Sequence, residues 1–235
     1  MGNIRRLEMA EIKVDAKGKR IKTELTTCKG TVIGFSAVTS PSTKFNPDGQ
    51  YSISILIPKK EGEEMLKLFQ EVKRQQYKTF GKSSTAQEIS RLKPYVVVVK
   101  NDDGEIVSET PDEEGRFILK ATEKATIRCK NGEVINKKIK VFDAKGKPCN
   151  DLKIGEGSVV RLAIDVAGYT VAGKTGISVG LKAVQVIEYI EYGEGGTAEN
   201  FGFEVEEGFE TKDEEGFKET VKEEDDDITE DEIGF

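Results

Sequence analysis

The chain of 235 residues contains no histidine, no tryptophan and only three cysteines. The lack of histidine removes the commonest general base and the commonest metal ligand, which argues against most enzyme classes. Cys28, Cys129 and Cys149 are odd in number and widely spaced, so they predict neither a disulfide framework nor a zinc knuckle. We therefore expect reduced thiols, no cofactor, no metal site and no catalytic residue.

Long hydrophobic runs are also missing. No stretch of about 18 apolar residues is present, and the first 20 residues lack the apolar segment and cleavage site of a signal peptide. These absences predict a cytoplasmic protein that does not associate with a membrane.

Charge is divided unevenly along the chain. The formal net charge is −7, but residues 194–235 alone contain 18 acidic residues and 3 lysines. Residues 1–193 contain 33 basic and 25 acidic residues, a net charge of +8. A basic globular part predicts a polyanionic ligand, while a terminal block of like charge is typical of a disordered interaction tail or of a solubilising tail.

Hydrophobic periodicity predicts a mostly β domain with one helix. Residues 51–57 alternate between apolar and polar positions, which is the pattern of a half-buried strand, and Pro58 ends it. Residues 61–77 instead place apolar side chains three or four apart, which predicts an amphipathic helix. Further strands are expected at 29–38, 95–99, 117–121, 125–130, 138–143, 158–167 and 177–189.

Many strands and a single helix favour an OB-like antiparallel β barrel over an alternating α/β sheet. The fold class that we predict is all-β with one helix, followed by a disordered acidic C-terminal tail. The barrel is expected at 22–193 and the tail at 194–235. Residues 1–21 form an N-terminal arm, which is either mobile or a short edge strand.

Residues 168–175, GYTVAGKT, match the pattern G-x-x-x-x-G-K-[ST] of a phosphate-binding P-loop. A P-loop needs a following helix whose N-terminal amides face the phosphates, but the next residues alternate as a strand. We instead expect a hairpin loop from Gly168 to Gly176 that joins the last two barrel strands. Tyr169 and Lys174 are expected at its tip, where the last loop of an OB barrel commonly contacts oligonucleotides.

Carboxylates cluster at two predicted turns. A nuclease metal site would use such groups to bridge a divalent ion and a phosphate. Turn chemistry explains them much better, because aspartate and glycine favour turns, and we predict solvated side chains. The residues concerned are Asp102, Asp103, Asp112, Glu113 and Glu114.

Basic residues lie beside aromatic residues at several points. A groove for single-stranded nucleic acid needs cations along the phosphate backbone and flat rings beneath the bases. One pair alone is a weak signal, because an aromatic residue in a strand usually belongs to the core. Arg116, Phe117 and Phe142 belong to the same pattern. Together the pairs predict DNA contacts from Lys44, Phe45, Arg91, Lys93, Tyr95, Lys138, Lys140, Tyr169 and Lys174.

The acidic tail ends in an apolar pair, Ile233 and Phe235. A solubilising tail has no need of a terminal aromatic residue, whereas a docking peptide gains from it an anchor and a carboxylate for capture. We therefore predict that a protein partner binds Asp231, Glu232, Ile233 and Phe235.

Several segments resemble one protein family. NPDGQYSISILIPKK at 46–60 precedes the predicted helix, LKPY follows at 92–95, and VFDAKGKPCNDLKIGEGS occupies 141–158. With the strand that contains Tyr169 and the ending at 231–235, these segments make most of the chain resemble the bacteriophage T-seven type of replicative single-stranded DNA-binding protein. That family has an OB fold and an acidic tail that ends in phenylalanine.

The resemblance implies protection of single-stranded DNA, strand annealing and a role in DNA replication and recombination in the host cytoplasm. It also implies that the tail contacts the replicative DNA polymerase and the primase-helicase, and that Tyr169 stacks on a base. The family prototype has a tryptophan two positions later, where this chain has Val171. A homodimer remains open. So do two other functions, a virion or assembly-scaffold protein and a P-loop or metal-dependent enzyme.

Overall fold

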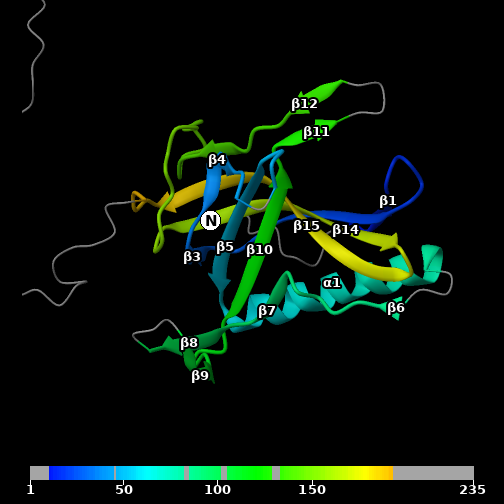
Figure 1. Ribbon diagram of the computed structural model, residues 1–235, viewed down its shortest axis with the longest axis horizontal. Coiled ribbons are helices and arrows are strands. Elements are labelled where there is room, and N and C mark those ends of the chain that lie inside the picture. Colours follow the sequence, from blue (N-terminus) through cyan, green and yellow to red (C-terminus); the bar gives the residue numbers. More distant parts are fainter. Residues whose placement is uncertain (1–10, 45, 82–84, 102–104, 129–132, 193–235) are drawn as a thin grey trace, which may run out of the picture. The chain divides into compact units, whose positions relative to one another are not determined.

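The computed structural model describes residues 11–44, 46–81, 85–101, 105–128 and 133–192. Within them, the predicted class of an all-β protein with one helix is confirmed (Figure 1). The first elements are β1 (Lys13–Val14), β2 (Ile21–Thr26), β3 (Gly30–Val32), β4 (Ala37–Ser42), β5 (Gln50–Ile57), α1 (Lys59–Phe80), β6 (Thr85–Ala86) and β7 (Leu92–Pro94). They are followed by β8 (Val96–Lys100), β9 (Ile106–Pro111), β10 (Phe117–Lys124), β11 (Thr126–Arg128), β12 (Val134–Asn136), β13 (Lys140–Phe142), β14 (Val159–Val171) and β15 (Lys174–Glu188).

One large sheet carries most of the strands. Its pairings lead from β14 through β3, β5, β10 and β15 and back to β14, while β2 and β1 extend it beyond β14. Most pairings are antiparallel, as predicted. The pairings of β15 with β6, β10 and β13 are parallel, which the sequence did not predict.

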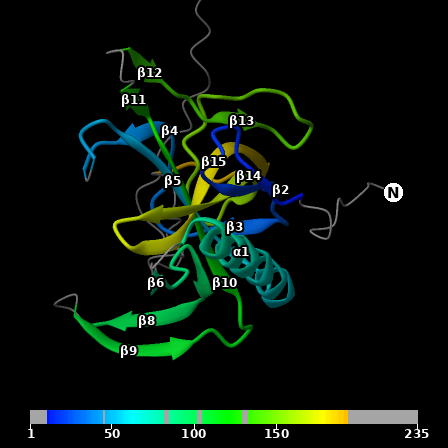
Figure 2. The same ribbon diagram turned by 90° about the vertical axis from the view of Figure 1, so that its right-hand side faces the viewer.

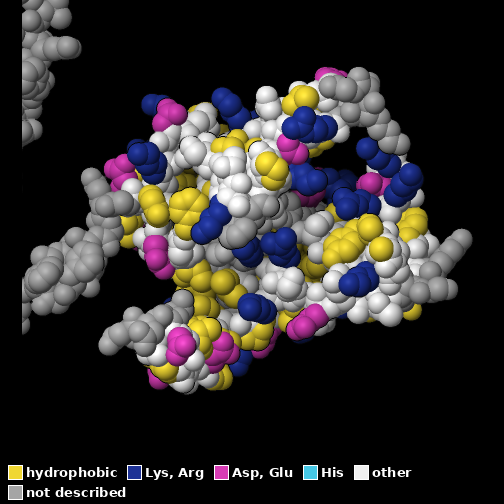
Figure 3. Space-filling model, viewed as in Figure 1, with side chains coloured by type: hydrophobic (Ala, Val, Ile, Leu, Met, Phe, Trp, Pro, Cys, Tyr) yellow, Lys and Arg dark blue, Asp and Glu magenta, His cyan; other side chains and the backbone are white. Residues whose placement is uncertain are grey.

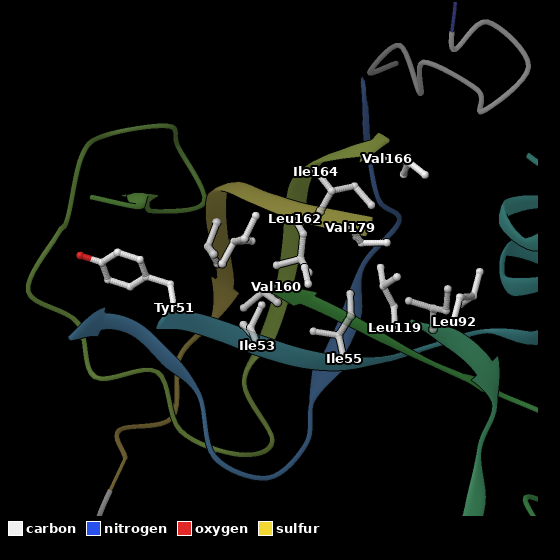
Figure 4. Packing of buried hydrophobic residues seen from close by; sticks show 14 of the residues in the cluster. Tyr51, Ile53, Ile55, Leu92, Leu119, Val160, Leu162, Ile164, Val166 and Val179 are labelled. Atoms are coloured by element: carbon white, nitrogen blue, oxygen red, sulfur yellow. The ribbon is translucent and has the colours of Figure 1, made fainter. Parts of the chain in front are cut away.

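The core lies on the inner face of this sheet. Alternation along β5 turns Tyr51, Ile53, Ile55 and Ile57 inward, as predicted, and each is at least 96% buried. Figure 4 shows Ile53 and Ile55 directed toward apolar side chains of other strands, such as Leu162 of β14. Burial of each large apolar side chain contributes on the order of 1.5–3 kcal/mol, so the circuit of strands is held mainly by this core.

The helix α1 is three residues longer at its end than predicted and packs against β14 and β15 (Figure 2). Met65, Phe69 and Val72 form its buried face. Gly62 also faces inward, and a Cβ added there would lie 2.4 Å from the Phe117 ring. The absence of a side chain at this position lets the first turn of α1 approach β10.

Two predicted segments differ from the structure. The strand expected at 29–38 is divided into β3 and β4, because Gly34 between them has a positive φ of 62°, which a regular strand does not contain. The arm at 1–21 contributes β1, which pairs with β2 as an edge strand. Strands β9 and β12, which complete two separate hairpins with β8 and β11, were not predicted.

Candidate nucleic-acid interface

A groove lies on the outer face of β5 and β10, opposite the core. Because side chains alternate along a strand, the residues between buried positions face outward. Gln50 and Ser52 of β5 and Lys120 and Thr122 of β10 form its floor, and its volume is about 690 Å³. Thr122 lies opposite Ser52 in the antiparallel register, so the floor is a continuous sheet surface that presents hydroxyl, amide and ammonium groups.

Irregular segments around the sheet supply the rim of the groove. Phe35 comes from the segment between β3 and β4, Ser42 from the end of β4, and Arg91 from the segment before β7; Lys44 and Asn46 follow β4. Among the described residues, the lining thus contains three cations and no carboxylate. Figure 3 shows lysine and arginine side chains over β5 and β10. Such a lining attracts a polyanion.

A row of cations continues from the floor toward β7. The Lys120 amide donates to the Arg91 carbonyl at 2.8 Å, which fixes these two neighbours in one register. Lys93 lies opposite Ile118, whose side chain is on the outer face of β10 with Lys120. Arg91, which precedes β7, therefore faces outward with Lys93 on β7 and Lys120 on β10, where a phosphate backbone can contact them in sequence.

Phe35 is the one aromatic residue among the described residues that line the groove. Its side chain is 59% exposed, which is unusual for a phenylalanine. Its ring makes an edge-to-face contact with Tyr192, with ring centroids 5.4 Å apart and planes at 79°. The contact fixes the ring orientation while the side chain remains open to solvent, so Phe35 can offer a flat surface to a base.

An ion pair fastens the β11–β12 hairpin beside the groove. Asn46, at the rim, begins a turn in which its side-chain oxygen accepts from the Asp48 amide at 3.1 Å. Arg128 of β11 then contacts the Asp48 carboxylate at 2.7 Å and holds the pKa of that carboxyl below its usual value. The pair is partly exposed, so it orients the hairpin more than it stabilises the fold.

The structure brings only some of the predicted DNA-contact residues together. Lys44 and Arg91 line the groove, and Lys93 extends its row of cations. Tyr95 is half-buried beyond β7, where its amide donates to the Arg116 carbonyl at 2.8 Å. Phe45 and the tail residues Asp231, Glu232, Ile233 and Phe235 lie outside the described residues.

Two predicted lysines lie elsewhere on the sheet. Lys140 begins β13, which pairs with β15 at the far end of the strand order, and Lys138 precedes it. Both are exposed, but neither lines the groove. Of the aromatic residues in the same pattern, Phe117 is 6% exposed and belongs to the core, so it is not available to a base.

The hairpin loop predicted for 168–176 is much shorter in the structure. β14 continues to Val171 and β15 begins at Lys174, so the turn consists of Ala172 and Gly173. Both residues have positive φ, 48° and 72°, as a two-residue type I′ turn requires. The strands extend farther than predicted because residues 168–171 and 174–176, which lack apolar alternation, still pair one to one across this turn.

Tyr169 therefore lies within β14 and not at the tip, which corrects the prediction. It is opposite Gly176, across which its ring extends, since a Cβ added to that glycine would meet the tyrosine oxygen at 2.6 Å. Its hydroxyl donates to Gln87 Oε1 at 2.8 Å. Lys174 flanks the turn and is exposed, but neither residue lines the groove.

The sequence pattern did contain a signal for the missed floor residues. Lys120 and Thr122 alternate with Leu119 and Ala121 of β10, so their outward direction follows from the same period of two that predicted the strand. The sequence did not indicate that β10 pairs with β5. This pairing brings the outward polar residues of the two strands together. For Phe35, in an irregular segment, no signal was available.

The enzyme alternatives find no geometric support in the described part of the chain. Residues after Lys174 form the strand β15, where a P-loop needs a helix. The prediction of solvated carboxylates is wrong for Asp112, whose side chain is buried and pairs with Arg116 at 2.7 Å. The described residues contain no cluster of three metal-ligating side chains. No helix among the described residues is long and apolar enough to cross a membrane.

Comparison with known proteins gives one family match and several similar structures. A family model for the single-stranded DNA-binding protein of Enterobacter phage Enc34 matches residues 23–221. The fold is similar to that of gp2.5, a single-stranded DNA-binding protein encoded by bacteriophage T7, with 20% identity, a TM-score of 0.59, and 81% of this chain and 100% of that chain covered. The phage Enc34 protein in complex with single-stranded DNA is also similar, with 16% identity, a TM-score of 0.47, and 79% and 99% coverage. No curated protein sequence matches the chain significantly.

Proposed function

Because the chain belongs to the family of the Enterobacter phage Enc34 single-stranded DNA-binding protein, we propose that it binds single-stranded DNA in the groove over β5 and β10. The observation that carries this proposal is a lining with three cations, an exposed aromatic ring and, among the described residues, no carboxylate. Phosphates contact Lys44, Arg91 and Lys120, and a base stacks on Phe35. Stacking in such sites contributes ~1–3 kcal/mol per base.

Binding in this groove has little sequence preference. The hydroxyls of Ser52 and Thr122 can each donate or accept a hydrogen bond, and the Gln50 amide can do both, so none of them selects one base edge. Every base has a flat face, so stacking on Phe35 is also tolerant of sequence. The exposed Lys93, Lys138, Lys140 and Lys174, with Tyr95 and Tyr169, serve as further contacts for a strand that extends beyond the groove.

Charge removal in the groove tests this function. We expect Lys120→Ala and Arg91→Ala to weaken binding of an oligo-dT strand and to lower the log-log salt slope by about 0.7 for each phosphate that the variant no longer neutralises. Lys67→Ala on the exposed face of α1 removes the same charge outside the groove and should change neither quantity. The proposal is wrong if the two groove variants bind the strand as tightly as the Lys67→Ala control, or if the affinity of the wild type does not depend on salt.

The acidic tail has two roles in this proposal. It recruits the replicative DNA polymerase and the primase-helicase through Asp231, Glu232, Ile233 and Phe235, and it competes with DNA for the basic domain at 22–193. Support comes from the −15 charge of residues 194–235 beside the +8 charge of the rest of the chain. The protein thus acts without catalysis in phage-type DNA replication, recombination and strand annealing in the host cytoplasm.

A further inference from the structure

The β8–β9 hairpin combines exposed apolar side chains with a concentrated negative charge. Residues 95–115 contain seven acidic residues and one lysine, a net charge of −6, although residues 1–193 as a whole carry +8. Figure 3 shows apolar and acidic side chains together at this hairpin, at the lower left. A contiguous exposed apolar surface marks an interaction site. The exposed fractions are 37–49% for Val96, Val97, Val98 and Val99, and 57% and 60% for Ile106 and Val107.

The base of the hairpin is firmly held. The Asp112 amide donates to the Tyr95 carbonyl at 3.2 Å, and the Tyr95 amide donates to the Arg116 carbonyl at 2.8 Å. The Arg116 guanidinium also binds both carboxylate oxygens of Asp112, at 2.7 and 3.1 Å. The hairpin therefore leaves the main sheet in a fixed direction, which reduces the entropy that docking of a partner costs.

The backbone of β8 presents hydrogen-bonding groups at an open edge. Because the Asp112 amide donates to the Tyr95 carbonyl around the Val96–Pro111 pair, Val96 and Pro111 form a non-hydrogen-bonded pair of the antiparallel ladder. The pairs alternate, so Val98 and Glu109 form the next pair of this kind. The amide and carbonyl groups of Val96 and Val98 thus point away from β9. Within the described residues, no third strand covers that edge.

The outer edge of β9 is less able to accept a strand. Pro111 has no N–H group, and Glu109 places a charge there; both features discourage pairing at an edge. β8 instead has four valines in succession and no proline. An added strand is therefore directed to β8.

We propose that β8 binds an extended segment of another protein in which basic and apolar residues alternate. The segment adds a third strand to the hairpin through main-chain hydrogen bonds with Val96 and Val98. A basic residue opposite Val98 lies on the same face as Glu109, which flanks Val98 on its other side. Adjacent strands are ~4.8 Å apart, so the aliphatic stem of a lysine can cover Val98 while its ammonium group reaches the Glu109 carboxylate.

The opposite face of β8 sets the apolar half of this pattern. Val97 and Val99 lie there, opposite Thr110 and Ser108 of β9, which carry no charge. β-Branched and other apolar residues of the partner segment pack well against such valines across neighbouring strands. Alternation of basic and apolar residues therefore fits both faces at once.

Charge excludes the other occupants of this edge. A net charge of −6 repels nucleic acid, the acidic residues 194–235 and a second copy of the same hairpin. A basic and apolar protein segment is complementary to the surface in both respects. DNA in the basic groove and a protein on the acidic hairpin then bind to surfaces of opposite charge, so neither competes for the site of the other.

Two synthetic peptides of identical composition test the pattern. One alternates lysine and valine, and the other carries the same lysines and valines in two separate blocks. Fluorescence anisotropy with the full-length chain should show about 10-fold tighter binding of the alternating peptide, because only this peptide can add its backbone to β8 with both faces matched. The block peptide measures simple attraction to acidic residues, including those of the tail. Equal affinities of the two peptides would overturn the proposal.

A proline at Val98 tests the edge itself. Val98→Pro removes an N–H group that faces the added strand and none that pairs with β9, so the hairpin is retained. The affinity for the alternating peptide should fall about 10-fold, since a peptide carbonyl loses its hydrogen bond. Val98→Thr keeps the N–H group and the β-branched shape and should bind nearly as tightly as the wild type. Equal binding by the proline and threonine variants would contradict strand addition.

Removal of one acidic group tests the charge. Glu109→Gln should weaken binding of the alternating peptide and reduce its dependence on salt, whereas Glu63→Gln on the exposed face of α1 should change neither. Oligo-dT affinity should be the same in all these variants, which also shows that the domain is folded. If Val98→Pro instead lowers oligo-dT affinity, or abolishes a self-association seen by ultracentrifugation, β8 belongs to DNA or to a second copy and the proposal is wrong. DNA binding in the groove is independent of either result with the peptides.

Discussion

Phe35 is the residue that we propose to stack on a base of the bound strand. The neighbouring cations attract any polyanion, but a flat exposed ring is the feature that fits a single strand, whose bases are unpaired. The ring is held in place by Tyr192, so little orientation is lost on binding. The selectivity of the groove for single-stranded over duplex DNA should therefore depend on this side chain.

Replacing Phe35 tests that dependence. We expect Phe35→Ala to weaken oligo-dT binding by ~1–3 kcal/mol, roughly 5- to 150-fold, as measured by fluorescence titration. Phe35→Leu keeps an apolar side chain but removes the ring, and should lose most of the same affinity. Because the side chain is largely exposed, neither change should lower the melting temperature noticeably. A leucine variant that binds oligo-dT as tightly as the wild type would show that Phe35 does not contribute to affinity by stacking.

Gly62 is a second residue with a large effect, in this case on stability. Glycine to alanine in a helix usually stabilises by about 1 kcal/mol, but here the added methyl group overlaps the Phe117 ring. We expect Gly62→Ala to lower the free energy of unfolding by ~1–3 kcal/mol in urea titrations, as overpacking of a core does. Combining it with Phe117→Leu should recover part of the loss relative to Phe117→Leu alone. A stabilised single variant would contradict the packing described.

At the scale of elements, alternation in the sequence predicted β5 and its buried face correctly, and the helix periodicity predicted most of α1. The pairing partners were not predictable, because the residues that pair are far apart in the chain: Ile53 lies opposite Ala121, and Thr122 opposite Gly180. The floor of the groove depends on these pairings. Lys44 and Arg91 were predicted as DNA contacts from the aromatic residues near them in the sequence, whereas the floor residues Lys120 and Thr122 were missed.

The β8–β9 hairpin provides a pH prediction. Arg116 lowers the pKa of Asp112 below its usual value of 3.8, so the ionised carboxylate stabilises the folded hairpin base. A lowered folded pKa means that this stabilisation is present above the unfolded pKa and is lost as pH falls through the folded pKa. Asp112→Asn should therefore melt at a lower temperature than the wild type at pH 7, and this difference should shrink below about pH 4. A difference that persists unchanged to pH 2 would show that the charge is not responsible.

At the scale of the whole molecule, the opposite charges of the domain and the tail are the basis of the proposed competition between the tail and DNA. Deleting residues 194–235 should tighten oligo-dT binding, most strongly at low salt, where screening is weakest. Equilibrium titrations at two salt concentrations measure the effect. Equal affinities of the full and truncated chains at low salt would exclude competition by the tail.

Phe235→Ala separates the two proposed roles of the tail. It removes an apolar anchor and none of the charge, so binding of the polymerase or primase-helicase should fall while DNA affinity stays almost constant. Surface-immobilised partner proteins can measure the first quantity and oligo-dT titration the second. If the tail only increases solubility, neither quantity should change.

The long β14–β15 hairpin also has a consequence for how the chain folds. Thirteen residue pairs meet across a two-residue turn, so these pairs form with a small loss of chain entropy, whereas the pairing of β2 with β14 joins residues more distant in sequence. We expect the hairpin to be largely formed in the folding transition state. Val166→Ala, inside it, should mainly slow refolding, while Ile21→Val, in β2, should mainly speed unfolding, as stopped-flow kinetics would measure. The hairpin that includes the P-loop-like sequence is then the nucleus around which the DNA-binding sheet assembles.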